Sequence, residues 1–137
     1  MKRPSLRIFA WLACLALLLP VCAAATEAQA PPASPTPGMV TMLDLGAHKC
    51  IPCRMMAPII KELAEEYKGL ASILFIDVWE NPAEGKKYGL RGIPTQIFYD
   101  KDGKEVSRHM GFMDKKTIKA TLEKLGAPPP KGAADAR

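Results

Sequence analysis

The chain has 137 residues and a formal net charge of +5; 48% of its residues are hydrophobic and 24% are charged. These proportions are typical of a globular protein and exclude a disordered or fibrous centre. Once both ends are discounted, the length leaves room for one folded domain with one core, and a second domain is not expected.

The first 25 residues have the layout of a secretory signal peptide. Three basic residues within the first seven positions precede an uncharged apolar run over residues 8–21, and small residues follow that run. We expect cleavage after Ala25 or, as a second candidate, after Ala30. The alternative is that the segment is retained as an N-terminal membrane anchor. A membrane span needs about 20 apolar residues, and the apolar run together with the small residues that follow it is long enough for this. The protein is therefore expected to be exported, and to be periplasmic or anchored to the inner membrane.

Removal of this segment takes away three positive charges and no negative ones, which lowers the net charge from +5 to +2. No run of Lys and Arg interleaved with aromatic residues remains, so nucleic acid is not an expected partner. Residues 26–38 are rich in Pro and Ala and predict an extended linker, and residues 127–137 predict a flexible tail. The folded domain is thus expected over residues 39–126.

The first half of this domain predicts a β-α-β unit. Residues 40–45 form a short apolar run that is typical of a buried strand, and Asp44 is the one charged residue in it. Over residues 52–68, apolar side chains recur at three- and four-residue steps, which indicates an amphipathic helix that ends at Gly69. Residues 72–77 are nearly all apolar, as in a strand covered on both faces. We expect the two strands to be parallel, with a right-handed connection.

The second half predicts a short helix, a hairpin and a final helix. Asn81 and Pro82 are a helix start signal, and the helix is expected to end near residue 88. Residues 95–99 and 104–110 flank a tight-turn sequence, which predicts an antiparallel hairpin. Asp114 caps the last helix, and Gly126 ends it. The predicted order is β-α-β-α-β-β-α.

Only two cysteines, Cys50 and Cys53, remain after the signal segment takes Cys14 and Cys22 away. A bridge that encloses two residues restrains almost no chain entropy and is poor as a structural cross-link. Cys50 is expected at the junction of strand and helix, and Cys53 one turn inside the helix, so the two sulfurs can bond. The helix N-terminus favours a thiolate at Cys50, which makes it the attacking thiol and Cys53 the resolving thiol.

Three other interpretations of the cysteine pair stay open. The first is a zinc half-site or a passive bridge, although zinc needs two further ligands and only His48 and His109 supply nitrogen. The second is a copper-handling protein that uses the same cysteines. The third is a non-catalytic binding module with a docking surface formed by Met55, Met56, Ile93 and Phe112. We expect no bound metal.

Several separated motifs in this order resemble the thioredoxin superfamily over about 85 residues. The matching residues are Asp44, Cys50-Ile51-Pro52-Cys53, Ala57-Pro58, residues 88–95 and Gly111. The resemblance implies an α/β fold, the minimal thioredoxin fold with a four-stranded mixed sheet flanked by helices. It also implies that Pro94 is a cis-proline facing the sulfurs, and that Ile51, Pro52, Ile93 and Pro94 bind the substrate.

The resemblance further implies that Asp44 is a buried carboxylate beneath Cys53, and hence a third catalytic residue. Burial should raise its pKa and suit it to accept a proton from Cys53. The sequence departs from thioredoxins at Lys49, at Gly46 and at the pair between the cysteines. The lysine expected near the carboxylate corresponds to Ile73. The redox potential of thioredoxin therefore cannot be carried over.

The resulting functional hypothesis is an extracytoplasmic thiol-disulfide oxidoreductase, of the protein-disulfide reductase type. The 41-residue step from Cys53 to Pro94 leaves no room for the helical insertion typical of DsbA-like oxidases. We expect no cofactor beyond the redox-active disulfide Cys50–Cys53. The expected partners are protein disulfides and a membrane electron donor, with cytochrome c maturation as one candidate process, and the protein is expected to be a monomer.

Overall fold

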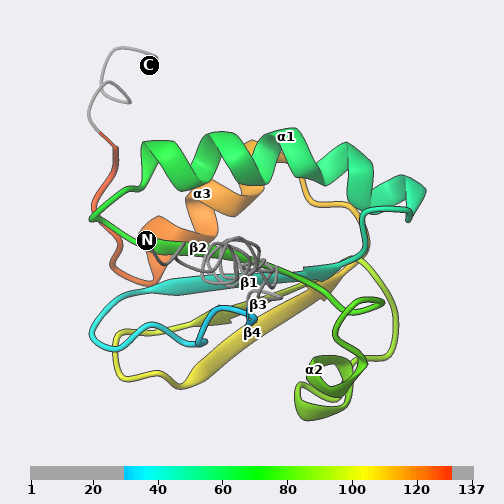
Figure 1. Cartoon of the computed structure of the whole chain (residues 1–137). Coiled ribbons are helices and arrows are strands. Elements are labelled where there is room, and N and C mark those ends of the chain that lie inside the picture. The colour runs from blue at the N-terminus through cyan, green and yellow to red at the C-terminus, as the bar shows by residue number, and fades with distance from the viewer. Residues whose placement is uncertain (1–29, 131–137) are drawn as a thin grey trace, which may run out of the picture.

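The computed structural model of the chain describes residues 30–130 (Figure 1). The segment predicted to be a signal peptide or anchor lies outside the described residues, as does the predicted tail from residue 131 onward. None of the helices within residues 30–130 has the length and apolar character that a bilayer span requires.

Four strands form one mixed sheet in the order β2-β1-β3-β4. The strands are β1 (Thr41–Gly46), β2 (Ser72–Asp77), β3 (Thr95–Tyr99) and β4 (Glu105–Met110). β1 pairs in parallel with β2 and antiparallel with β3, which in turn pairs antiparallel with β4. The predicted fold class, a four-stranded mixed sheet flanked by helices, is confirmed. β1 is buried along its whole length because it lies inside the sheet and is covered on both faces.

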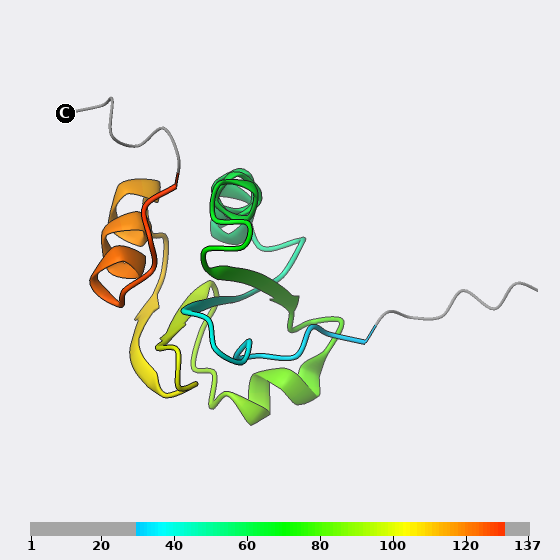
Figure 2. The same cartoon turned by 90° about the vertical axis from the view of Figure 1, so that its left-hand side faces the viewer.

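Three helices cover the two faces of the sheet. α1 (Ile51–Glu66) and α3 (Lys115–Lys124) lie over one face, and α2 (Pro82–Lys87) lies over the other (Figures 1 and 2). The side chains of β1 alternate between these faces, since successive residues of a strand point in opposite directions. Met42 belongs to the core under α1, whereas Leu43 and Leu45 belong to the core on the α2 side. Asp44 and Gly46 therefore face α1.

The helix boundaries follow the sequence signals closely. α1 begins one residue earlier than predicted and ends at Glu66, and Gly69 takes the positive φ of +76° expected of a glycine after a helix. The Asp114 side chain accepts a hydrogen bond from the Thr117 N–H at 3.0 Å and so caps α3 as predicted. Asn81 occupies the N-cap position of α2, but its side chain makes no capping hydrogen bond.

Part of the predicted linker and the first residue of the predicted tail pack against the domain. The Thr36 hydroxyl donates to Ser72 Oγ at 2.8 Å, and the Tyr88 hydroxyl donates to the Ser34 carbonyl at 3.3 Å. At the other end Ala127 is only 4% exposed and belongs to the core under α1. The packed part of the chain thus extends beyond residues 39–126 on both sides.

Candidate active site

The two cysteines lie at the N-terminus of α1 and form a disulfide, with their Cα atoms 5.3 Å apart. Cys50 is the N-cap residue, and the Cys53 backbone N–H donates a hydrogen bond to its sulfur at 3.4 Å. The first turn of α1 carries no acidic side chain. Both the N–H donor and the positive end of the helix dipole therefore favour a thiolate at Cys50 once the disulfide is reduced. The two side chains are nearly buried, at 8% exposed for Cys50 and 4% for Cys53.

The four residues predicted to bind substrate divide into two pairs. Ile51 and Pro52, between the cysteines, are exposed, and Ile51 is 75% accessible. Ile93 is half-buried and packs against the two cysteines and Ala47, and the Ile93–Pro94 peptide bond is cis as the resemblance implied. The disulfide thus has exposed apolar surface on one side and the cis-proline loop on the other.

Only part of the expected docking surface is exposed. Met56 is fully buried in the core under α1, so its inclusion in that surface was wrong. Met55 and Phe112 are exposed, at 58% and 45% accessible. The difference follows from helical spacing, because adjacent residues of α1 point about 100° apart around its axis and only one of two neighbours can face the sheet.

Asp44 is 1% exposed and lies on the face of β1 that is covered by α1. Gly46, two residues further along the same face, is so close to Cys53 that a Cβ added to it would lie 3.3 Å from the cysteine Sγ. Burial raises the pKa of Asp44 to about 6, and a hydrogen bond from Gln96 partly opposes this rise. Asp44 is therefore a carboxyl group that can change protonation near neutral pH, on the same face as Cys53.

The residue beside Asp44 on β2 is Phe75, not Ile73. The strand register pairs Asp44 with Phe75 and Ile73 with Met42, so the sequence correspondence was displaced by two residues. Phe75 is not a lysine either, so the expected departure from the thioredoxin pattern remains. Phe75 lies close to Gly46 and, with Cys53, lines a cavity of about 250 Å³ whose walls also include His48, Arg54 and Lys61.

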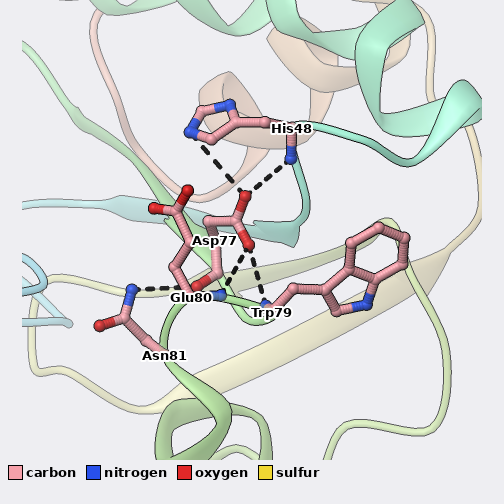
Figure 3. A network of polar contacts seen from close by, with 5 residues as sticks. All are labelled: His48, Asp77, Trp79, Glu80 and Asn81. Atoms are coloured by element: carbon pink, nitrogen blue, oxygen red, sulfur yellow. Dashed lines mark hydrogen bonds and ion pairs between the residues drawn. The ribbon is translucent and has the colours of Figure 1, made fainter.

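A second buried carboxylate, Asp77, lies at the end of β2 and was not predicted to have a role (Figure 3). Its oxygens accept hydrogen bonds from the backbone N–H groups of His48 at 2.7 Å, Trp79 at 2.8 Å and Glu80 at 3.1 Å. Burial alone would raise its pKa, but these hydrogen bonds outweigh burial and keep the pKa below its usual value. Asp77 therefore ties the loop that precedes Cys50 to the end of β2. A charged residue at the end of an apolar strand was the available signal for it.

The side chains of His48, Asp77 and Glu80 bring potential metal-ligating atoms within 4.8 Å of one another. In Figure 3 the Asp77 carboxylate points toward the backbone of the loop, with His48 above it. The His48 Nε2 lies 3.9 Å from the nearer Asp77 oxygen. Since Asp77 already accepts three backbone N–H groups, the cluster is accounted for by its structural role in the loop.

Comparison with known proteins agrees with this geometry. A sequence model of the family described as Thioredoxin matches residues 37–124. The chain belongs to the thioredoxin family. It is 44% identical over 85 residues to thioredoxin of Staphylococcus aureus strain Mu50, and the match covers 62% of this chain and 81% of that protein. The thioredoxin of strain MW2 matches to the same extent.

A solved structure, that of a mutant thioredoxin from Halobacterium salinarum NRC-1, resembles the fold with a TM-score of 0.59 and 33% sequence identity. The alignment covers 68% of this chain and 80% of that one. The protein is thus a thioredoxin-like thiol-disulfide oxidoreductase of the protein-disulfide reductase type, with a disulfide at its Cys-x-x-Cys motif. Membership of this family implies protein disulfides as substrates.

Proposed function

We propose that this member of the thioredoxin family acts outside the cytoplasm as a protein-disulfide reductase, with Cys50 as the attacking thiol and Cys53 as the resolving thiol. The observation that carries the assignment of roles is the hydrogen bond from the Cys53 N–H to the Cys50 sulfur at the start of α1. This donor stabilises negative charge on Cys50 alone.

The reaction consists of two thiol-disulfide exchanges. The Cys50 thiolate attacks one sulfur of a substrate disulfide, which forms a mixed disulfide and releases the other substrate sulfur as a thiolate. Cys53 then loses its proton and attacks the Cys50 sulfur. The Cys50–Cys53 disulfide forms, and the second substrate sulfur leaves and takes up a proton. The substrate gains two electrons and two protons, and the enzyme is left oxidised.

Asp44 accepts the proton that Cys53 must lose in the second exchange. Its raised pKa, about 6, leaves it mostly ionised at neutral pH and still basic enough to accept a proton transiently. The cavity lined by Cys53 gives water access to the Cys53 sulfur. The residue beside Asp44 on β2 is Phe75, so no lysine at that position assists the transfer. The transfer therefore relies on the carboxylate and on water.

The proposed location rests on the N-terminal sequence. Three basic residues followed by an apolar run are the pattern of export signals, and the Cys-x-x-Cys pair is the only pair of cysteines downstream. A reductase in an oxidising compartment needs electrons from the cytoplasmic side, so we assign it a membrane dithiol protein as electron donor. Oxidised cysteines of exported proteins, cytochrome c precursors among them, are the proposed substrates.

Insulin reduction with dithiothreitol tests the assignment of the thiols. We expect the wild-type chain to accelerate insulin precipitation and the Cys50→Ser and Cys53→Ser variants to lose this activity. Cys53→Ser and Cys53→Ala should both accumulate mixed disulfides in cells, because without the resolving thiol Cys50 cannot be released from the substrate. Cys50→Ser should accumulate none. Equal insulin reduction by wild type and Cys50→Ser would contradict the catalytic role and support a binding module.

A fusion of the full chain to alkaline phosphatase tests the location, since the phosphatase is active only after export. We expect activity from this fusion and none when the first 25 residues are deleted. Activity without the segment, or none with it, would contradict the proposed location and leave the thiol chemistry intact.

A further inference from the structure

Within the described residues, the side chain of Gln96 is the one group that donates a hydrogen bond to the Asp44 carboxylate. β3 pairs antiparallel with β1 so that Gln96 lies directly opposite Asp44. Gln96 is fully buried, and its Nε2 donates to Asp44 Oδ1 at 2.8 Å while also lying 3.1 Å from Met56 Sδ. A buried amide in an apolar core is costly unless it is hydrogen-bonded. The pairing with Asp44 therefore explains why a glutamine occupies this core position.

The other end of this amide, Oε1, is buried and has no hydrogen-bond partner among the described residues. An ionised carboxylate only accepts hydrogen bonds, whereas a protonated carboxyl group has one O–H to donate. An amide offers both a donor and an acceptor. When Asp44 is ionised, Nε2 donates to it; when Asp44 is protonated, a half-turn of the amide presents Oε1 to the new O–H. Gln96 can thus satisfy both protonation states.

The elements packed around Asp44 present few competing groups. β2 places Phe75 beside it, β3 places Gln96, and α1 presents Met56 and, above Gly46, Cys53. Among these, Cys53 is the only titratable side chain, and the cavity beside Cys53 adds His48, Arg54 and Lys61. No charged side chain within the described part of the chain contributes to the pKa of Asp44, which reflects burial and the Gln96 hydrogen bond.

We propose that Gln96 is a positioning residue whose amide rotates with the protonation of Asp44 and so sets the pH range in which Cys53 resolves the mixed disulfide. This inference rests on the proposed role of Asp44 as the proton acceptor. In the step concerned, the Cys53 proton passes to Asp44, the Cys53 thiolate attacks Cys50, and the substrate thiolate leaves. Asp44 returns its proton to solvent or to the leaving thiolate, and Gln96 returns to its first orientation.

The test uses the reduced full-length chain and a chromogenic aryl disulfide, which releases one aryl thiolate on attack by Cys50 and a second on resolution by Cys53. The rate of the second phase is measured against pH. In Gln96→Met the donor is lost at similar volume, so we expect the midpoint of the second phase to rise by about one pH unit or more. The first phase should keep its wild-type pH profile.

Two further measurements separate this role from a purely structural one. Ile97→Val is the matched control, since Ile97 packs on the opposite face of β3, and its midpoint should not move. In the wild type, the ¹⁵N resonance of the Gln96 side-chain amide should titrate with the same midpoint as the ¹³C carboxyl resonance of Asp44. This second readout needs no variant and would still decide the matter if Gln96→Met failed to fold.

The inference and the proposed function fail in different ways. Asp44→Asn should remove the pH step of the second phase, and a second phase unchanged in Asp44→Asn would overturn the role of Asp44 and the inference with it. If Asp44→Asn removes the step but Gln96→Met leaves the midpoint in place, or if the Gln96 amide does not respond at the Asp44 midpoint, the positioning role of Gln96 alone is overturned.

Discussion

Two buried aspartates, Asp44 and Asp77, lie in neighbouring strands of the same sheet and have pKa values shifted in opposite directions. Asp44, in the middle of β1, has one side-chain amide as donor, and burial raises its pKa to about 6. Asp77, at the end of β2, accepts three backbone N–H groups, and its pKa lies below the usual value. Both side chains are hidden from solvent, but Asp44 lies deep in the core and Asp77 at the end of the edge strand β2. Depth of burial and the number of donors together decide whether the carboxyl group can exchange protons or stays ionised.

The same difference separates a chemical from a structural role. Asp44 stands on the α1 face near Cys53, where a proton must be accepted during the second exchange. Asp77 fixes the loop between β1 and α1, which delivers Cys50 to the helix N-terminus. The two sites are therefore expected to respond to substitution with opposite signs in stability.

The largest stability effect is expected from Asp77→Ala. Removal of the carboxylate leaves three backbone N–H groups without their acceptor, and we expect a loss of about 3–4 kcal/mol in the free energy of unfolding. Urea denaturation of the oxidised protein at pH 7 measures it. Because the pKa of Asp77 is lowered on folding, its contribution is present above the usual pKa of 3.8 and should fade as pH falls further. The exposed Asp102→Ala serves as control and should change stability by no more than about 0.5 kcal/mol.

Asp44→Asn is expected to increase the free energy of unfolding, because it removes a buried charge. Raising the pKa of Asp44 from 3.8 to about 6 means that its ionisation costs the folded state about 3 kcal/mol at pH 8. We expect Asp44→Asn to recover about 2 kcal/mol of this, because the neutral amide still needs hydrogen bonds in the core. The gain should shrink as pH falls from about 6 to 4, where the wild-type carboxyl group becomes protonated. A variant less stable than wild type at pH 8 would contradict the raised pKa.

A smaller loss of stability is expected at Gly46. This residue pairs with Asp77 on β2 and lies on the same face of β1 as Asp44. A Cβ at this position would lie 3.0 Å from Phe75 Cε2 and 3.3 Å from Cys53 Sγ. We expect Gly46→Ala to cost about 1–2 kcal/mol through overpacking. The double variant Gly46→Ala/Phe75→Leu should recover part of the loss, since the contact with the ring is then relieved. Equal losses in the single and double variants, in thermal or urea denaturation, would show that the ring is not the obstacle.

The fold and the cysteine pair were accessible from the sequence because their signals are local. Helix caps, glycines and the periodicity of residues 52–68 define elements within a few residues of each other. The hydrogen-bond partner of Asp44 could not be predicted from local signals of this kind. Gln96 lies 52 positions away and meets Asp44 only through the antiparallel register of β1 and β3.

The misplaced correspondence at Ile73 has the same origin. Residues 72–77 form a nearly uniform apolar run, so their composition does not reveal which of them lies beside Asp44. A shift of two positions keeps the same face of the strand, and alternation therefore gives no warning of the error. Only the observed pairing of Asp44 with Phe75 settles the register.

The smallest stability effect is expected at the partly exposed carboxylate of Glu66 on α1, which is a third environment beside those of Asp44 and Asp77. Lys115 on α3 contacts Glu62 and Glu66, and hydrogen bonding to Lys115 is the largest cause that lowers the pKa of Glu66. These groups are partly exposed, so solvent screens the interaction, and we expect Lys115→Gln to cost about 0.5 kcal/mol at low salt. The loss should decrease further in about 0.5 M salt, whereas the effects at Asp77 and Asp44 should hardly change, because buried groups are screened much less. A salt-independent loss above about 2 kcal/mol would mean that the contact between α1 and α3 depends on Lys115 through packing, not charge.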